Sequence, residues 1–485
     1  MTDAAVEEAD SGRRWRSSAT GPAPADAGPV LLLCPSLFSI RNVLHSRLLP
    51  GLRELGHRVE VLGLPGAGPV AFAEPGPDQR FSEIDLAPRK RVTGAAALGI
   101  IQNASFYRRH RLTTDRLTQW WYRRHEGVWR RVQYGMLEAA GAVGAWDPLY
   151  RWQMRRLETL RLAGGDMAAV RRSLASARPS LVVATSCINP IEDLFLAAAR
   201  DLGVPTLGCI QSFDHLTGRS LTADCDHYAV WNERMRDQLL RYHPVRAPSQ
   251  VSVTGTPQFD FHVRPEFRWS RERLLRELGM AENERYIAYA ATTESQTPTE
   301  PVLVAEFIRR AAASPVLGGH RVLVRVHPND DFGRWKALAA SAPRAIVSLP
   351  ATRSEAFNGP EDQARLVSTL LHADVSINVW SSMSLDAAAV GTPVVCVAFA
   401  GVRGTAEDRF CRMVYETDFY APIARSGGVR LAYDMDALVA EAEAYVRDRR
   451  RDEAARRQLA AAECGPLDGR SAERIGRLID RLARR

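Results

Sequence analysis

Long apolar runs are missing from this chain of 485 residues. The longest, at residues 30–33 and 394–400, fall far short of the roughly 20 residues that a membrane-spanning helix needs. No apolar segment follows a basic start, so the N-terminus lacks the pattern of a secretory signal. The sequence therefore predicts a cytoplasmic protein without a transmembrane helix. Residues 1–28 mix Ala, Pro, Gly and charged residues without periodicity, which predicts a disordered tail.

Closely spaced cysteines and glycine-rich phosphate loops are missing as well. The seven cysteines are scattered without a Cys-x-x-Cys pair, and several lie in apolar, strand-like segments. This pattern predicts buried thiols in a reducing compartment and no metal site. Neither G-x-G-x-x-G nor G-x-x-x-x-G-K-[ST] occurs. Their absence argues against an NAD-dependent enzyme and against a P-loop NTPase.

Positive charge is present in modest excess. The net charge of +8 comes from arginine far more than from lysine. Such a balance permits nucleic acid, anionic lipid or phosphorylated ligands as partners and does not choose among them. The apolar fraction of 46% and the charged fraction of 25% are those of a globular protein, and the length favours two domains over one.

Short apolar runs alternate with amphipathic helical segments in two series along the chain. The first series starts at residue 30 and ends near residue 255, and the second covers residues 286–399. This alternation is typical of parallel sheets built from right-handed crossover units. We therefore expect an α/β protein with two Rossmann-like, doubly wound domains that face each other across a cleft.

The domain boundaries follow from where these series stop and start. We expect an N-terminal domain at residues 29–256, a more polar linker at residues 257–284 and a C-terminal domain at residues 285–485. The charged, helical segment that begins at residue 435 is assigned to the C-terminal domain.

Residues 94–164 are expected to form a helical insertion in the N-terminal domain. The insertion holds half of the ten tryptophans and several arginine pairs, such as Arg108-Arg109 and Arg155-Arg156. Two interpretations stay open. Either the Trp side chains pack inward and the arginine stems cover the outside, or a basic aromatic surface rests on the anionic inner face of the cell membrane or grips an anionic acceptor.

Polar turns that follow the strands of the C-terminal domain are candidates for ligand binding, because doubly wound sheets bind ligands at the carboxyl ends of their strands. Thr293 lies in one such turn, where hydroxyls and backbone N–H groups suit a phosphate; a helix N-cap is the alternative. Arg325 and His327 alternate along another strand and so share a face, and Pro328 ends that strand. A structural role is the alternative for His327.

The strongest candidate turn contains Ser381 and Ser382, where a strand gives way to a helix. Hydroxyls, unpaired N–H groups and the positive end of the helix dipole suit a pyrophosphate there. Asp386, one helical turn further on, is expected to accept a hydrogen bond from a ribose hydroxyl. The alternative for this turn is helix capping alone.

Asp214 and His215 follow a strand of the N-terminal domain. A carboxylate and an imidazole side by side in a cleft-facing loop are candidates for the general base that deprotonates an acceptor hydroxyl. An Asx turn that stabilises the loop accounts for Asp214 equally well.

Several motifs resemble a known superfamily. The segments GHRVEVL and SSMSLDAAAVGTPVV resemble those of the GT-B nucleotide-sugar glycosyltransferases. Within that superfamily, RVHP, SFDHLTG, YAVWNE, VTGTPQFD and the tail segment at residues 421–448 look most like bacterial surface-carbohydrate transferases and the group of CDP-glycerol glycerophosphotransferases. The resemblance covers most of residues 29–480 outside the insertion.

The resemblance implies nucleotide-diphosphate binding in the C-terminal domain, with His327, Ser381 and Ser382 at the matching positions, and acceptor binding in the N-terminal domain. It also implies a nucleotide-sugar donor as substrate and no tightly bound metal or other cofactor. The glycerophosphotransferases usually have Asp-Tyr before the two serines, where this chain has Val379-Trp380. This departure favours a sugar donor over CDP-glycerol.

The resulting hypothesis is a glycosyltransferase that moves a sugar to a hydroxyl of a glycan or lipid-linked acceptor in surface polysaccharide or glycoconjugate synthesis. Two alternatives from the same fold are a glycerophosphotransferase and a non-hydrolysing sugar-nucleotide epimerase. A third is a basic binding module for membrane or nucleic acid without catalysis. The sequence contains no recognised nucleic-acid-binding motif, so nucleic acid is not expected as a partner.

Overall fold

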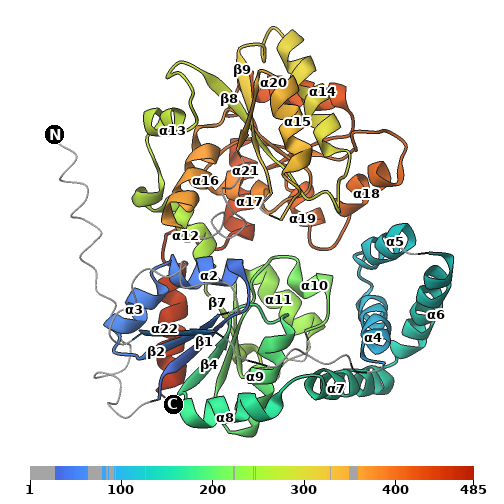
Figure 1. Ribbon diagram of the computed structural model, residues 1–485, viewed down its shortest axis with the longest axis vertical. Coiled ribbons are helices and arrows are strands. Elements are labelled where there is room, and N and C mark those ends of the chain that lie inside the picture. The colour runs from blue at the N-terminus through green and yellow to red at the C-terminus, as the bar shows by residue number, and fades with distance from the viewer. Residues whose placement is uncertain are drawn as a thin grey trace.

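The computed structural model describes residues 28–63, 79–83, 86, 92, 94–125, 127–221, 224–243, 245, 247–327, 329–348 and 359–484. Two parallel β-sheets, each flanked by helices, form the two halves of the molecule, and a group of four helices lies to one side (Figure 1). The predicted α/β architecture with two Rossmann-like domains is confirmed. The expected disorder of the N-terminal tail and the role given to Pro328 fall on residues outside the described ones.

The first sheet has the strand order β3-β2-β1-β4-β5-β6-β7, and every pair of neighbours is parallel. Its central strands are apolar throughout and fully buried, because helices cover both faces of the sheet. The strands are β1 (Val30–Cys34), β2 (Val59–Gly63), β3 (Gln79–Glu83), β4 (Leu181–Ala184), β5 (Thr206–Cys209), β6 (His227–Val230) and β7 (Val251–Val253).

The second sheet has the order β10-β9-β8-β11-β12-β13 and is again parallel throughout. Its order reverses beside β8, so the first strand of this domain lies in the middle of the sheet. The strands are β8 (Arg285–Ala290), β9 (His320–Arg325), β10 (Ala345–Ser348), β11 (Ser376–Asn378), β12 (Val394–Val397) and β13 (Arg430–Ala432).

Helices connect the strands within each domain. Those of the first domain are α2 (Leu37–Leu44), α3 (Leu48–Glu54), α8 (Met167–Ala177), α9 (Pro190–Asp201), α10 (His215–Gly218) and α11 (Glu233–Tyr242). The connection between the domains carries α12 (Pro257–Val263) and α13 (Arg271–Glu277). The helices that follow are α14 (Glu300–Ala313), α15 (Gly333–Ser341), α16 (Pro360–His372), α17 (Met383–Ala389), α18 (Ala406–Val414), α19 (Ala421–Ala424), α20 (Met435–Arg447), α21 (Glu453–Glu463) and α22 (Ser471–Ala483).

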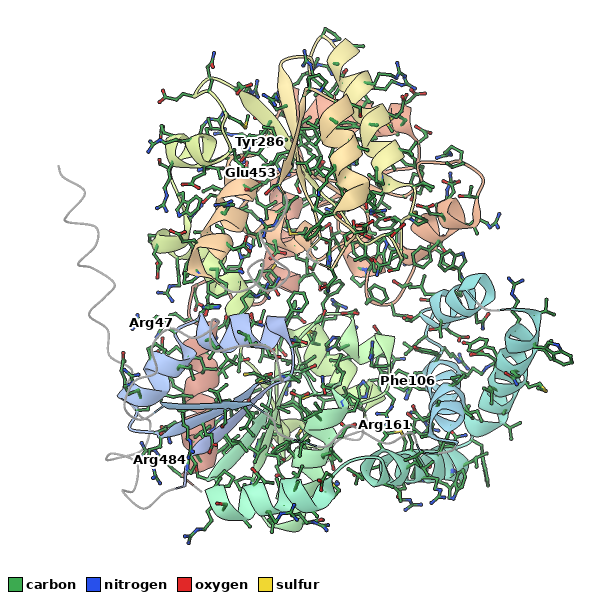
Figure 2. All side chains as sticks on the ribbon, viewed as in Figure 1. Arg47, Phe106, Arg161, Tyr286, Glu453 and Arg484 are labelled. Atoms are coloured by element: carbon green, nitrogen blue, oxygen red, sulfur yellow. The ribbon has the colours of Figure 1, made fainter. Side chains whose placement is uncertain are left out.

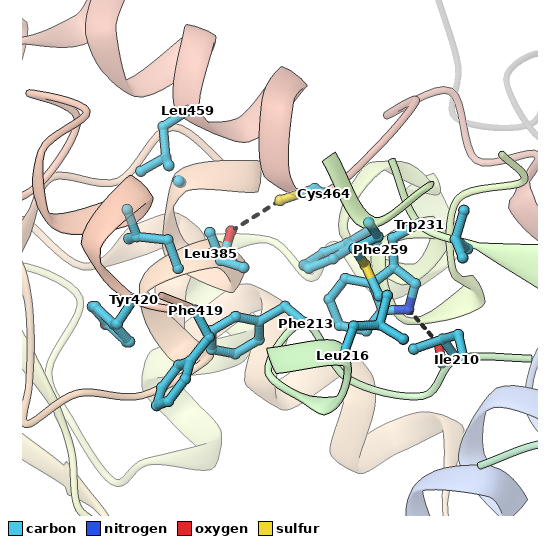
Figure 3. Packing of buried hydrophobic residues seen from close by; sticks show 14 of the residues in the cluster. Ile210, Phe213, Leu216, Trp231, Phe259, Leu385, Phe419, Tyr420, Leu459 and Cys464 are labelled. Carbon is cyan, nitrogen blue, oxygen red and sulfur yellow. Dashed lines mark hydrogen bonds between the residues drawn. The ribbon is translucent and has the colours of Figure 1, made fainter. Parts of the chain in front are cut away.

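One apolar cluster joins the two domains. It includes Trp231 and Leu216 of the first domain, Phe259 of α12 and Leu385 of α17. Figure 3 shows these side chains packed together, with the Trp231 indole N–H donating to the Ile210 carbonyl at 2.8 Å. Because the cluster is continuous, the helices that line the cleft are held against one another through a shared core.

The last helix crosses back to the first domain, which the sequence analysis did not foresee. Residues 471–483 were assigned to the C-terminal domain, but α22 lies beside α3 and the first sheet (Figure 1). Its apolar stripe, which includes Ile475 and Ile479, packs into the core of that sheet. Asp260 of α12 accepts hydrogen bonds from the first two backbone N–H groups of α22, each at 2.9 Å. Arg484 near the end of the chain (Figure 2) donates to Asp480 of the same helix.

The insertion folds as α4 (Ala95–His110), α5 (Asp115–His125), α6 (Val128–Gly144) and α7 (Asp147–Ala163). Phe106 lies on the side of α4 that faces the first domain (Figure 2), where its ring stacks on His243 at 5.4 Å. At its other side the insertion reaches the second domain, because the ring of Trp120 in α5 stacks on Phe410 of α18 at 4.0 Å. The insertion thus contacts both domains.

The tryptophans of the insertion do not all pack inward. Trp129, Trp146 and Trp152 expose 81%, 69% and 52% of their surface, so the interpretation that places them inside is wrong for these three. Among the described residues, no helix is both long and apolar enough to span a membrane.

Candidate functional site

The register of the second sheet brings three of the predicted binding turns together. Strand β8 lies between β9 and β11, and Ala290 at its end is paired with Arg325 and with Asn378. Because the three strands are parallel and neighbours lie about 4.8 Å apart, the turns that follow them emerge side by side at one edge. These are the turns that carry Thr293, His327 and the serine pair.

The first turn is held by buried charges beneath it. The backbone N–H of Thr292 donates to Glu300 at 3.0 Å, and Arg334 contacts the same carboxylate at 3.3 Å. Burial raises the pKa of Glu300 to about 7, although Arg334 and the Thr292 N–H oppose the shift. Thr293 itself is half-buried and lies 3.0 Å from the Ser295 hydroxyl. The turn therefore presents two hydroxyls on a fixed support.

Arg325 is engaged by a neighbouring helix rather than fully open to a ligand. Its NH2 group contacts both carboxylate oxygens of Asp362, at the start of α16, at 3.1 and 3.0 Å. Since a guanidinium carries five N–H donors, this ion pair leaves donors on the other nitrogens. Arg325 thus supplies positive charge at the edge of the sheet, partly offset by Asp362.

His327 lies just past the end of β9 with a defined tautomer. The backbone N–H of Asn329 donates to His327 Nδ1 at 3.1 Å. Because a neutral imidazole carries one hydrogen, the His327 hydrogen then belongs on Nε2, which becomes a donor. Burial lowers the pKa of His327, with Asp330 opposing the shift, so the ring is neutral near pH 7.

The serine turn is strained and supported by two tyrosines. Trp380 has a left-handed backbone with φ of 25°, which is unusual for a bulky residue. Its N–H donates to the Tyr415 hydroxyl at 2.8 Å, and the Tyr420 hydroxyl donates to the Ser381 carbonyl at 3.1 Å. The Ser382 side chain makes no capping hydrogen bond to α17, a helix of seven residues. The Met383 N–H donates to the Ser381 hydroxyl at 3.2 Å, so the capping alternative accounts for Ser381 but not for Ser382.

The turn after β5 in the first domain packs against the elements that support the serine turn in the second. Phe213 contacts the rings of Phe419 and Tyr420 at centroid distances of 6.0 and 6.2 Å, and Tyr420 is the residue bonded to Ser381. Asp214, next to Phe213, is half-buried and accepts a hydrogen bond from the Ser212 hydroxyl. The structure thus places the predicted catalytic turn near one of the predicted binding turns.

His215 is less accessible than its neighbour. It is buried at the start of α10, and burial lowers its pKa even though Asp214 raises it. Its Nδ1 atom is buried and has no hydrogen-bond partner among the residues that the structure describes. The neutral ring therefore lies behind Asp214, which is the more exposed of the two candidates.

The first domain adds polar contacts beside the Asp214 turn that the sequence analysis did not single out. Gln211 donates through Nε2 to the hydroxyls of Ser36 and Ser39 at 2.7 and 3.1 Å. In the next turn of the sheet, the buried Glu192 carboxylate accepts three backbone N–H groups of residues 185–187 at 2.7 to 2.9 Å. A carboxylate of the chain itself thus fills this anion-binding turn.

A buried charge network fixes the two domains relative to each other. Arg41 of α2 donates to Gln258 Oε1 at 2.9 Å, and Gln258 Nε2 donates to Asp386 Oδ1 at 3.0 Å. His262 Nε2 lies 3.1 Å from the same Asp386 oxygen. All four side chains are buried, so the network connects α2, α12 and α17 where little water reaches.

The pKa values show how strongly these charges depend on one another. Burial lowers the pKa of Arg41 to about 10, against the opposing effect of Asp386 and Asp362. Burial disfavours the charged form of Asp386, but the contacts with His262 and Gln258 outweigh it and lower the pKa of this carboxyl. Each charge is therefore tolerated in the interior because the other is present.

Asp386 occupies a different place from the expected one. The sequence analysis gave it a ribose hydroxyl as partner, whereas in the structure its carboxylate is buried against α12. The ribose contact stays a prediction, and the observed role is a contact between domains. Sequence reasoning missed Arg41, Gln258 and His262; an arginine within the apolar segment of the first helix was the available signal for Arg41.

Cavities flank this network on both sides. One of about 40 Å³ lies in the first domain beneath the cleft, against Gln211 and Trp231. A larger one of about 1070 Å³ lies between the two domains. It is lined by residues 232–234 of the first domain, by His262, and by residues at the end of α17 and around α21, which include Arg449 and Arg457. It contains none of the predicted site residues. Among the described residues, no three His, Cys, Asp or Glu side chains are grouped to hold a metal ion.

Comparisons with known proteins define the fold. No known family profile and no curated protein matches the sequence. The UDP-N-acetylglucosamine 2-epimerase of Methanocaldococcus jannaschii is similar in structure, with a TM-score of 0.54, 11% identity and alignment of 93% of this chain and 99% of that one. Another solved UDP-N-acetylglucosamine 2-epimerase aligns with a TM-score of 0.52 and 13% identity over 93% of this chain and 94% of its own. The chain has the GT-B fold, as the sequence analysis predicted.

The buried network predicts how substitutions of Arg41 and Asp386 change the free energy of unfolding. Asp386→Ala leaves Arg41 buried without its partner charge, so we expect it to lower the free energy of unfolding by about 3–5 kcal/mol. Adding Arg41→Met removes the unpaired buried charge and is expected to restore part of the lost free energy of unfolding. Urea unfolding of the two single variants and the double variant measures this coupling.

The exposed Asp436→Ala, which removes a surface ion pair with Arg310, is the control and is expected to change stability by less than about 1 kcal/mol. Losses that simply add in the double variant would show that Arg41 and Asp386 do not depend on each other.

Proposed function

We propose that this protein is a GT-B glycosyltransferase that moves a sugar from a nucleotide-diphosphate donor to a hydroxyl of a glycan or lipid-linked acceptor. The synthesis of surface polysaccharide or glycoconjugates is the process in which such a reaction belongs. The observation that carries the proposal is that three polar turns lie side by side at one edge of the second sheet. One of them, the serine turn, is linked through Tyr420 to the residue next to Asp214 in the first domain. The similar structures support a nucleotide-sugar as ligand, because they are named for UDP-N-acetylglucosamine.

The donor diphosphate is assigned to the turns after β8, β9 and β11. His327 Nε2–H, the hydroxyls of Thr293 and Ser382, and the free donors of Arg325 would contact its oxygens. Negative charge grows on the departing diphosphate as the sugar leaves, and donors already aimed at that position stabilise it. We propose that these groups act without a tightly bound metal ion.

The acceptor is assigned to the first domain. Asp214 is the proposed general base, since its carboxylate is half-buried in a cleft-facing turn and therefore reachable by a hydroxyl. The acceptor oxygen bonds to the anomeric carbon, the bond from that carbon to the diphosphate breaks, and the hydroxyl proton passes to Asp214. The Ser212 hydroxyl, which donates to Asp214, would hold the carboxylate in place.

A sugar-nucleotide epimerase is the second candidate, because the two similar structures described above are epimerases. It would use the same donor turns. The candidates differ in whether a second substrate takes the sugar, so their products distinguish them.

Incubation with UDP-, GDP-, CDP- and dTDP-sugars and mass-spectrometric analysis test the proposal. We expect net release of a nucleoside diphosphate together with a hexose-sized mass increase of an acceptor. A stereoisomer of the added sugar nucleotide would indicate epimerisation instead, and CMP released from CDP-glycerol would indicate phosphoglycerol transfer. The idea of an enzyme for nucleotide-sugars fails if no nucleotide raises the melting temperature of the folded protein.

Substitutions separate donor binding from catalysis. His327→Ala and Ser382→Ala each remove a proposed contact to the charged diphosphate, so we expect either to weaken nucleotide binding by about 1.5–3 kcal/mol. Asp214→Ala is expected to lower turnover by about 10²–10⁴-fold with donor affinity nearly unchanged. Calorimetric titration and initial rates measure both quantities.

Ser341→Ala, on an exposed serine at the end of α15, is the matched control and should change neither quantity. If all four variants bound the nucleotide equally well, the assigned donor site would be incorrect.

Donor binding is predicted to depend on pH through His327. Burial lowers the pKa of this ring in the unliganded protein, whereas a diphosphate beside Nε2 favours the protonated form. The added hydrogen goes to Nδ1, where it displaces the Asn329 N–H. Binding then takes up a proton, and the affinity for UDP rises as the pH falls from about 7.5 to about 6, by at most about tenfold per pH unit. Calorimetry in buffers of different ionisation enthalpy measures the uptake.

His327→Gln removes the titrating ring and should remove this pH dependence. A wild-type affinity that is constant over the range would rule out a direct contact between the ring and the diphosphate.

A further inference from the structure

Helix α6 is packed with its polar and small side toward the protein. Glu138 and Tyr134 are buried on this side, with the tyrosine hydroxyl donating to the carboxylate at 2.8 Å. Gly141 lies so close to α4 that a Cβ placed there would come within 2.4 Å of the Ala104 Cβ. The inner side of α6 is therefore made of a carboxylate, a phenol and glycine.

The outer side of the same helix is apolar. At about 100° per residue, its exposed apolar residues fall within an arc of about 100°. Val128, Trp129, Val132, Met136 and Val143 expose 74%, 81%, 49%, 61% and 69% of their surface. This arrangement is the reverse of an ordinary surface helix, whose apolar side faces the core.

The neighbouring helix also exposes apolar side chains. Trp146 lies at the α6–α7 corner and Trp152 on α7, both exposed, and α6 lies at the outer edge of the molecule (Figure 1). We use "the α6–α7 face" for Val128, Trp129, Val132, Met136, Val143, Trp146 and Trp152. Contiguous exposed apolar surface of this kind marks an interaction site.

The charges around the α6–α7 face are predominantly positive. Arg131 of α6 and Arg156 of α7 are exposed. Of the described acidic groups on these helices nearby, Asp147 contacts both Arg109 and Arg151 and Glu138 is buried. An anionic partner therefore fits this surface.

We propose that the α6–α7 face docks on a lipid bilayer that contains anionic phospholipid. Tryptophan and aliphatic side chains would enter the boundary between headgroups and acyl chains, and the arginines would contact lipid phosphates. A second copy of the chain fits less well, since pairing of this face with itself would bring arginines against arginines. The inference does not rest on the proposed enzymatic function.

Sedimentation of the full-length protein with vesicles tests the proposal. We expect binding to vesicles of about 30% phosphatidylglycerol in phosphatidylcholine, little binding to phosphatidylcholine alone, and weaker binding as salt screens the arginines. Tryptophan emission should shift to shorter wavelength when the anionic vesicles are added, because the indoles leave water.

A triple variant, Trp129→Ser, Val132→Ser and Trp146→Ser, is expected to bind these vesicles at least about tenfold more weakly, since it removes apolar surface that the bilayer would cover. The control pair is Leu202→Ser and Val302→Ser, which alters exposed apolar residues outside the face and should bind as the wild type does. Circular dichroism melting checks that each variant is folded.

Three results would overturn the proposal. One is wild-type protein that does not bind the anionic vesicles. Another is a folded triple variant that binds them as tightly as the wild type. The third is a wild-type dimer in light scattering that the triple variant converts to monomer, without vesicle binding, which would assign the face to self-association.

Discussion

The candidate site depends on a network of four buried side chains, in which Arg41 and Asp386 are linked through Gln258 and completed by His262. A buried charge is costly unless it is paired and hydrogen-bonded. The charges of this network come from elements of both domains, so burying either one requires the domains to meet in this arrangement. The same contact holds the first turn of α17, and hence the Ser381–Ser382 turn, at a fixed position relative to α2 of the first domain.

The remaining elements of the site follow from the register of a parallel sheet. Pairing of Ala290 with Arg325 and Asn378 is enough to align three polar turns at one edge. Local contacts then make each turn rigid. Glu300 and Arg334 lie under the first, and two tyrosine hydroxyls hold the strained serine turn. Rigid donors suit a ligand whose negative charge increases during the reaction, because they need no rearrangement at that moment.

Most of the fold and part of the site could be predicted from the sequence. Uninterrupted apolar runs predicted buried parallel strands, and polar residues directly after such runs identified the positions of Thr293, His327 and Ser382. Both signals are local. Arg41 and Gln258 are 217 residues apart, and no local pattern pairs them. The return of α22 to the first domain likewise depends on Asp260, which accepts from N–H groups more than 200 residues later.

The insertion shows a different limit of sequence reasoning. Its tryptophans and arginines have helical spacing, but spacing alone does not say which side of a helix meets the protein. Two residues determine which side of α6 faces the protein. Gly141 permits close approach to α4, and Glu138 is hydrogen-bonded on that side. The apolar side of α6 is consequently turned outward.

The central claim is that one cleft, fixed by the Arg41–Asp386 network, holds a nucleoside diphosphate at the turns after β8, β9 and β11. A crystal structure of the protein with bound UDP tests it most directly. The account predicts the diphosphate within hydrogen-bonding distance of His327 and Ser382. Diphosphate density in the cavity of about 1070 Å³ beside Arg449 and Arg457, with the cleft empty, would contradict it.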